Sequence, residues 1–409
     1  MAYKGKVISG DCHIDIPWLP ADLFTSKSPA HLRDRMPRVV ETSDGKQWFT
    51  EDSLLGWVAG AGLGLRPGGW DPYVPGASRR LDTMEERASF YSDGLKGLMH
   101  PTTPELRIKD QDTDGVSGEV IYGVLGLAGG LGFDDPDEIG MGGGDSPGAG
   151  YGISDPEVST AAYDVYNDWL GDFCKTNPDR FVGLACLSGH DPQKAASQLR
   201  HAAEIGLRGA ELNVSAVEEP IYHDNWDVLW AAADECNMSI SFHTTGLSPR
   251  VPKKSDREKY QMTYNAINLT QFQLSGAEFL SSISFSGACA RFPNFKFVLG
   301  ECGIGWIPYI LHRMDEEYEK QFFHLELGSN PSEFWRRQGV STFQHEFVTN
   351  EMVDLIGEDN IIWGSDYPHP DGIWPDSRKV IDENLGHLEE SKLRKIVCDN
   401  TANLYGFPN

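Results

Sequence analysis

Positive charge is scarce in this sequence. Of its 409 residues, 35 are lysine or arginine and 61 are aspartate or glutamate, so the formal net charge is −26. Phosphate groups are bound by clustered lysine and arginine side chains, and this balance therefore argues against nucleic acid and against anionic membrane surfaces as partners.

Paired cysteines and long hydrophobic runs are also missing. The seven cysteines are odd in number, scattered along the chain and form no Cys-x-x-Cys pair, which is typical of reduced thiols in a cytoplasmic protein. The first residues, MAYKGKVISG, do not resemble a secretory signal. The most apolar segment, LLGWVAGAGLGL near residue 60, is too short and too rich in glycine to span a bilayer. We therefore expect a cytoplasmic protein without a membrane anchor.

Strand and helix patterns alternate regularly along most of the chain. Short apolar runs that read as strands alternate with stretches in which apolar residues recur at helical spacing. The strand candidates are 7–11, 118–123, 180–187, 209–214, 238–246, 295–301, 341–347 and 360–366. Repeated strand–helix alternation predicts a parallel sheet with right-handed crossovers, and eight such units favour a closed (β/α)8 barrel, the TIM barrel of the α/β class.

Two long segments interrupt this alternation. The connection between the first two strands, roughly 12–118, is far longer than one helix and contains an insertion, about 40–105, rich in glycine, proline and tryptophan. After the second strand, residues 123–152 include twelve glycines and no GxxxxGK[ST] motif, so we expect no nucleotide site. Both segments leave the ends of barrel strands where such barrels keep their chemistry, and each is expected to form a lid or a subunit contact. The prediction is one barrel domain, 1–409, with these two additions.

Polar side chains gather where several predicted strands end. In VISGDCHID (7–15) the side chains of Asp11, His13 and Asp15 share one face of an extended strand, because side chains alternate with period two. Polar residues end later strands as well: His243, Glu301, His345 with Glu346, and Asp366 with His369 just beyond. Buried charges must be paired or bound to a cation, so carboxylates and imidazoles that converge at one end of a barrel predict a metal site.

Several of these stretches resemble one known family. Asp-x-His on the first strand, FH at 242–243, WGSDYPH at 363–369 and NTANLYGF at 400–407 are similar to the amidohydrolase-related family of the amidohydrolase superfamily. This branch includes aminocarboxymuconate-semialdehyde decarboxylase and the resorcylate decarboxylases, and residues 180–212 are similar to it too. The resemblance covers 5–15 and most of 110–409, but not the insertion.

The resemblance implies a set of metal ligands. Asp11 and His13 match the ligand pair of the first strand, His243 the ligand of the fifth, and Asp366 the aspartate of the eighth. The family also assigns to this aspartate the acceptance of a proton from metal-bound water. A set of two histidines and two aspartates is less selective for zinc than a histidine-rich one. We expect zinc first, with iron or manganese as alternatives, and one or two ions.

Glu301 departs from the family pattern. Decarboxylase members place a catalytic histidine at the end of the sixth strand, where this chain has a glutamate. Glu301 could be a general base, a further metal ligand, or the partner of an arginine such as Arg313 in a salt bridge. The other candidates for additional ligands or for support of the ligands are Asp15, His345, Glu346 and His369. His345 and Glu346 are neighbours and would face opposite ways on a strand, so at most one points inward.

The sequence therefore predicts a metal-dependent enzyme acting on a small organic substrate. A metal-activated water would serve in hydrolysis, or the metal would assist a decarboxylation that needs no organic cofactor. One alternative is a non-haem iron or manganese oxygenase with a mono- or dinuclear site in the same barrel. Another is a non-catalytic, metal-binding partner subunit. Family members are commonly dimers, which implies a homodimer or a hetero-oligomer with a related chain.

Overall fold

The computed structural model describes residues 3–51, 53–60, 92–123, 153, 155–214, 217–244, 254–369 and 372–408. Residues 61–91 of the insertion and nearly all of the glycine-rich segment lie outside this part of the chain. Their expected role as a lid or subunit contact stays a prediction, as does the assignment of 1–409 to one domain.

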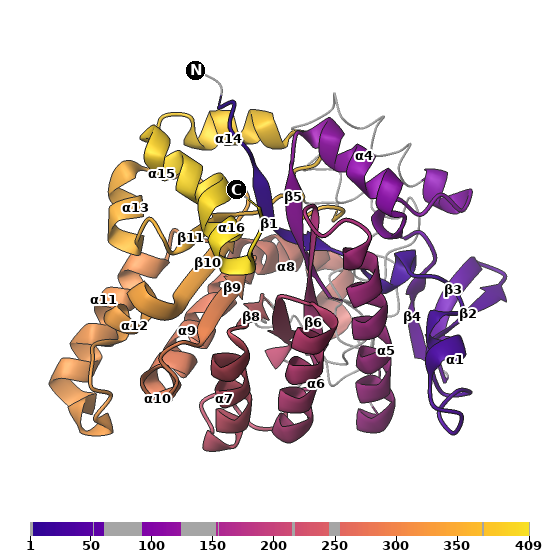
Figure 1. Ribbon diagram of the computed structural model, residues 1–409, viewed down its shortest axis with the longest axis horizontal. Coiled ribbons are helices and arrows are strands. Elements are labelled where there is room, and N and C mark those ends of the chain that lie inside the picture. The colour runs from indigo at the N-terminus through magenta and orange to yellow at the C-terminus, as the bar shows by residue number, and fades with distance from the viewer. Residues whose placement is uncertain are drawn as a thin grey trace.

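Eight parallel strands form the central sheet (Figure 1). They are β1 (Ile8–His13), β5 (Gly118–Tyr122), β6 (Phe181–Leu187), β7 (Gly209–Leu212), β8 (Ser239–His243), β9 (Lys296–Gly300), β10 (Gly339–Phe343) and β11 (Ile361–Trp363). Neighbours in the sheet follow the order of the chain, β1-β5-β6-β7-β8-β9-β10-β11. Each strand overlaps one of the eight predicted strands, and the predicted (β/α)8 barrel is confirmed.

The barrel closes between its first and last strands. The backbone N–H of His13 donates to the carbonyl of Tyr367 over 2.7 Å, and that of Asp366 donates to the carbonyl of Asp11 over 2.8 Å. Glycines permit this close approach: a Cβ atom at Gly364 would lie 2.5 Å from the Cβ of Asp11, and one at Gly10 would lie 2.0 Å from a side-chain carbon of Ile362. The closure therefore brings the polar ends of β1 and β11 together.

Helices follow the strands and cover the outside of the barrel (Figure 1). Two of them begin at a capping aspartate: the side chains of Asp155 and Asp191 accept hydrogen bonds from backbone N–H groups of the first turn. The helices are α1 (Leu23–Lys27), α4 (Pro104–Asp114), α5 (Pro156–Lys175), α6 (Pro192–Ile205), α7 (Asp227–Cys236), α8 (Arg257–Gln271), α9 (Ser275–Phe285), α10 (Ala288–Arg291), α11 (Ile307–Glu317), α12 (Pro331–Gln338), α13 (Asn350–Ile356), α14 (Ser377–Leu385), α15 (Glu390–Arg394) and α16 (Asn400–Tyr405).

A small antiparallel sheet lies beside the barrel, in a segment for which no strands were predicted. It consists of β2 (Arg38–Thr42), β3 (Gly45–Thr50) and β4 (Ser53–Trp57) in the order β2-β3-β4 (Figure 1). Trp48 of β3 is fully buried and its ring packs edge-on against Phe24 of α1, with centroids 5.9 Å apart. The start of the insertion is thus a folded sheet with its own buried contact.

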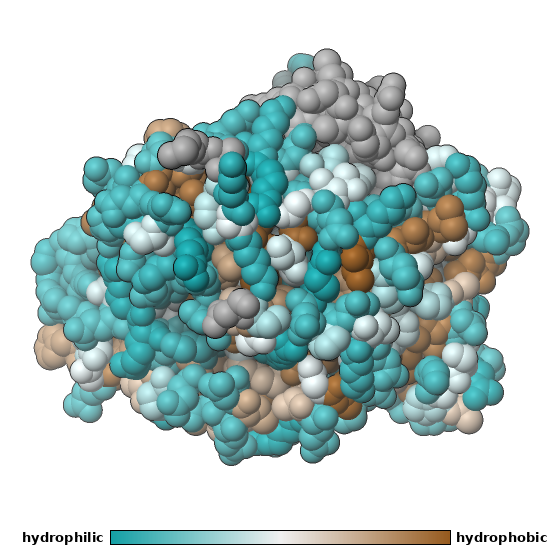
Figure 2. Space-filling view, turned by 45° about the horizontal axis from the view of Figure 1, so that its top comes forward, coloured by the Kyte–Doolittle hydropathy of each residue, from teal (hydrophilic) through white to brown (hydrophobic). Residues whose placement is uncertain are grey.

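The described residues on the face shown in Figure 2 are mainly hydrophilic. On the face shown in Figure 2, hydrophobic patches are small and separated by hydrophilic side chains. None of the helices in the described part of the chain is both long and apolar enough to cross a bilayer.

Candidate metal centre

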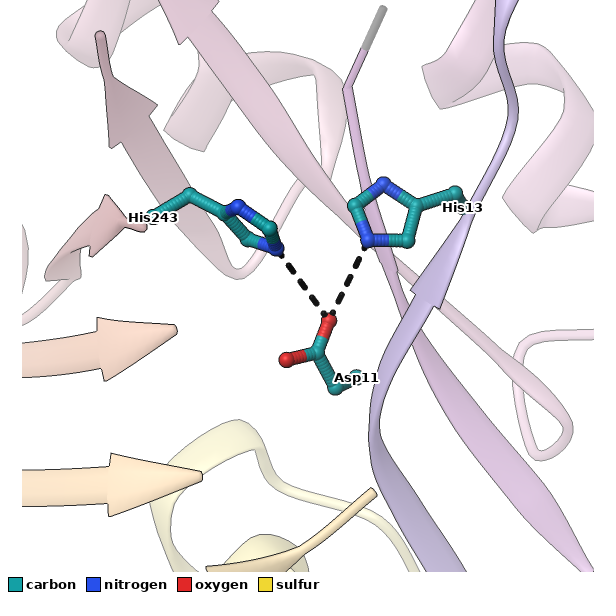
Figure 3. Close-up of side chains that lie close together, drawn as sticks. All are labelled: Asp11, His13 and His243. Atoms are coloured by element: carbon teal, nitrogen blue, oxygen red, sulfur yellow. Dashed lines mark ion pairs between the residues drawn. The ribbon is translucent and has the colours of Figure 1, made fainter. Parts of the chain in front are cut away.

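Three of the expected ligands meet inside the barrel. Phe242 of β8 packs outward against Trp230 of α7, with ring centroids 6.1 Å apart, so the next residue along the strand, His243, faces inward. Asp11 and His13 of β1 face the same space, and Figure 3 shows the three side chains pointing toward one another. One potential ligand atom from each of the three lies within 4.8 Å of the other two.

The distances place one carboxylate oxygen between two imidazoles. Oδ1 of Asp11 lies 3.4 Å from Nε2 of His13 and 3.7 Å from Nε2 of His243 (Figure 3). Asp366, just after β11, brings a second carboxylate, with Oδ1 3.2 Å from the same Nε2 of His13. All four side chains are buried. The residues that the resemblance implied as ligands therefore converge.

Several buried polar atoms at this centre have no hydrogen-bond partner in the described part of the chain, which indicates whether these residues suit a cation. Within the described residues, Oδ1 of Asp11, both ring nitrogens of His13, Nε2 of His243 and Oδ2 of Asp366 have no such partner. Leaving so many buried polar atoms unsatisfied is costly, and a cation bound among them would remove that cost. The donor set of two imidazoles and two carboxylates suits a divalent metal ion.

The second oxygen of Asp11 is held away from this centre. Oδ2 accepts a hydrogen bond from Oγ1 of Thr342 over 2.8 Å and another from the backbone N–H of Glu301 over 3.0 Å. These bonds orient the carboxylate so that Oδ1 faces the two imidazoles. Thr342 was not predicted as a site residue, because its place on β10 beside a ligand of β1 becomes visible only once the barrel is closed.

Asp15 and His369 support Asp366. Nε2 of His369 lies 2.8 Å from Oδ2 of Asp15, and its Nδ1 lies 3.0 Å from Oδ1 of Asp366. The His369 ring also stacks on His13, with centroids 4.1 Å apart and planes at 21°. An imidazole held between two carboxylates restricts the orientation of the second one, as is common for residues that contact metal ligands. A second group of potential ligand atoms, from His13, Asp15 and His369, has the same close spacing.

Glu301 follows β9 and has a left-handed backbone conformation, with φ of 50°. Its buried side chain accepts a hydrogen bond at Oε1 from Nε2 of Gln344 over 3.1 Å, and its Oε2 lies 3.7 Å from Nε2 of His243. The prediction of a salt bridge between Glu301 and Arg313 is wrong. Arg313 lies on α11 and pairs with Glu316 and Glu317 of its own helix.

His345 and Glu346 lie outside the centre. β10 ends at Phe343, so the assumption that both residues belong to a strand is wrong. His345 is exposed, and the carboxylate of Glu346 accepts hydrogen bonds from the backbone N–H groups of Ile304 and Gly305 over 2.8 and 2.9 Å. Glu346 thus stabilises the loop after β9, and neither residue faces the four converging side chains.

In the absence of a metal, His243 holds a proton and Asp11 is ionised. Burial alone would raise the pKa of Asp11 and lower that of His243. The contacts of Asp11 with His13 and His243 outweigh burial at both groups. The pKa of Asp11 is therefore lowered, and that of His243 is raised to about 10. Because a metal binds the neutral imidazole, binding must release a proton at neutral pH.

Metal affinity is accordingly expected to fall as the pH falls. For each proton displaced, the Kd for Mn²⁺ should rise about tenfold per unit of pH decrease between about pH 8 and pH 6. Isothermal titration calorimetry in two buffers of different ionisation enthalpy measures both the Kd and the protons released. A Kd that does not change over this range would contradict the protonated state of His243.

Comparisons with known proteins agree with this geometry. The amidohydrolase family model matches residues 127–407. The chain is 27% identical over 246 residues to the gamma-resorcylate decarboxylase of Rhodococcus jostii, covering 55% of this chain and 67% of that one. It is 22% identical over 248 residues to the 2-amino-3-carboxymuconate-6-semialdehyde decarboxylase of Dictyostelium discoideum, covering 59% and 66%.

Solved structures share the fold. An amidohydrolase from Mycobacterium avium subsp. paratuberculosis superposes with a TM-score of 0.70 at 18% identity, covering 99% of this chain and 100% of that one. A dihydroxybenzoic acid decarboxylase from a Polaromonas species, solved with bound manganese, gives 0.57 at 20% identity and covers 79% and 93%. The family model spans more than half of the chain and confirms the resemblance seen in the sequence. The chain belongs to the amidohydrolase family and is an enzyme of the amidohydrolase superfamily.

Proposed function

We propose that this protein is a metal-dependent decarboxylase that removes CO₂ from a small hydroxylated aromatic acid without an organic cofactor. The convergence of Asp11, His13, His243 and Asp366, with their unpartnered buried atoms, carries the proposal. The decarboxylases named among the relatives support the choice of reaction. The reaction replaces a carboxylate on a ring carbon by hydrogen: the carbon–carbon bond breaks, its electron pair stays on the ring carbon, and that carbon takes up a proton.

The residues divide this work. Asp11, His13 and His243 would hold the cation with Asp366. A divalent cation at this place supplies positive charge that binds substrate oxygens and stabilises negative charge developing on them. Asp366 would hold a proton at a carboxylate oxygen and transfer it to the ring carbon. Asp15 and His369 keep that carboxylate oriented, and the burial of all these groups excludes bulk water.

We propose manganese as the metal. Structures of related decarboxylases were solved with bound manganese, and two carboxylates beside two imidazoles suit that ion. The first expectation, zinc, receives no support from these relatives.

Hydrolysis of a small carbonyl compound is the second candidate. It is favoured by Glu301, which stands at the end of the sixth barrel strand where the resemblance assigns a histidine to decarboxylases. The relatives named above are decarboxylases and an amidohydrolase, and they lend no support to an oxygenase. We propose a homodimer or a hetero-oligomer with a related chain as the assembly. Sedimentation velocity measures the mass of the particle in solution and tests this proposal.

Product analysis tests the reaction. Protein stripped of metal and reloaded with Mn²⁺ is incubated with 2,6-dihydroxybenzoate, 5-carboxyvanillate and a panel of related hydroxybenzoates, and CO₂ and the ring product are measured. We expect CO₂ release from at least one acid, lost on chelation and independent of O₂. If the protein released CO₂ from none of these acids but hydrolysed neutral esters or lactones, decarboxylation would be rejected and hydrolysis would be the function.

A further inference from the structure

Helix α4 lies against the backbone that carries two of the candidate ligands. It ends the long connection from β1 and leads into β5. Arg107 of this helix is fully buried, and its Nη1 donates hydrogen bonds to the carbonyls of His13 and Pro101, each over 3.0 Å. Its Nε pairs with Glu119 on β5. A buried cation held in this way fixes the position of the carbonyl of His13.

Tyr367 holds the other side of the same backbone. Its carbonyl accepts the N–H of His13 over 2.7 Å, so His13 is held at both its N–H and its carbonyl. The hydroxyl of Tyr367 donates to Oδ2 of Asp110 on α4 over 2.7 Å. The guanidinium carbon of Arg107 lies 5.0 Å from the centre of the Tyr367 ring. α4 therefore contacts Tyr367 through two side chains.

The residue before Tyr367 needs such support. Asp366 has a φ of 55°, in the left-handed region that is uncommon for residues with a Cβ atom, although aspartate adopts it more often than most. Its N–H is bound to the carbonyl of Asp11, and its side chain is set against that of His13. Any movement of Tyr367 would therefore change the distance of 3.2 Å between Oδ1 of Asp366 and Nε2 of His13.

We infer that Arg107, Asp110 and Tyr367 are positioning residues of the metal centre, through which α4 sets the spacing of His13 and Asp366. None of the three is among the converging ligands, and they act through the backbone that bears those ligands. The inference rests on the proposed metal-dependent function. Its consequence is that the affinity for a metal depends on a hydroxyl–carboxylate bond on the outer side of the barrel wall.

Metal titrations of variants test this inference without any substrate. The Kd for Mn²⁺ is measured by calorimetry for the wild type and for Tyr367→Phe, Asp110→Ala and Asp110→Asn. Tyr367→Phe and Asp110→Ala should each raise the Kd about tenfold or more, the range seen when residues that orient metal ligands are removed. Asp110→Asn keeps an oxygen that accepts the Tyr367 hydroxyl and should stay within about threefold of the wild type.

As a matched control, a tyrosine hydroxyl is removed at a position away from the metal centre. The hydroxyl of Tyr318 accepts the backbone N–H of Leu327 over 3.0 Å, and Tyr318→Phe should leave the Kd unchanged. The visible spectrum of bound Co²⁺ reports the ligand geometry and should change in Tyr367→Phe but not in Tyr318→Phe. A wild-type Kd and Co²⁺ spectrum in Tyr367→Phe would overturn the inference. A wild-type protein that binds no Mn²⁺ would overturn the proposed function and this inference with it.

Discussion

Replacing Asp366 by asparagine is expected to lower kcat of the manganese-loaded protein by about a thousandfold. Asparagine keeps the shape of the side chain and an oxygen that can face the metal, but it cannot hold and release the proton that the ring carbon requires. Metal content measured by mass spectrometry on the same samples separates the loss of proton transfer from the loss of metal.

The control for this experiment changes an aspartate on the surface. Asp359 pairs with Lys395 and its side chain is 72% exposed, so Asp359→Asn should leave kcat unchanged. If Asp366→Asn retained its metal and kept kcat within about tenfold of the wild type, the proton would have to come from another group. Glu301 would then be the first residue to examine, because its carboxylate lies 3.7 Å from His243.

His243→Ala is expected to abolish metal binding. The bound Mn²⁺ should fall from about one ion per chain to below about a tenth, because the variant loses one of two imidazoles and leaves Asp11 with a single partner in the centre. Thermal unfolding gives an independent measure. At a Mn²⁺ concentration of about 100 times the Kd, the wild type should gain about 2.7 kcal/mol over its own metal-free form, and His243→Ala should gain nothing.

A surface histidine provides the comparison for His243. His201 on α6 is half exposed and pairs with Asp168, so His201→Ala should bind and respond to Mn²⁺ as the wild type does. One ion per chain in His243→Ala, with wild-type stabilisation, would mean that the cation binds elsewhere. The group formed by His13, Asp15 and His369 would then be the alternative.

The sequence predicts the barrel and its converging ligands because both follow from short-range periodicity. Asp11 and His13 alternate with outward-facing residues, and His243 directly follows an outward-facing phenylalanine, so their direction can be read once the strands are located. The order of the strands in a parallel barrel then determines which strand ends lie next to one another. Asp366 lies beyond the regular part of β11, but it ends the predicted strand 360–366, and the resemblance to the amidohydrolase-related family then implied its role as a ligand.

Contacts between distant segments could not be predicted in this way. Thr342 and Gln344 bind Asp11 and Glu301, but nothing in their own stretch of sequence indicates those partners. The error at His345 and Glu346 has a local cause: the pattern STFQHEF does not show that the strand ends at Phe343. The first hairpin of the β2-β3-β4 sheet did have a signal, since the Asp44–Gly45 pair between two strand-like runs is typical of a tight hairpin.

The tight closure of β1 against β11 has a consequence for how this barrel can be altered. Gly10 and Gly364 leave no room for even one methyl group between the strands that carry Asp11 and Asp366. A library of variants selected for a new substrate should therefore tolerate changes in the loops at the barrel mouth but lose metal-dependent activity at these two positions. The mutational freedom of the enzyme therefore ends at two glycines that offer no ligand atom to the metal.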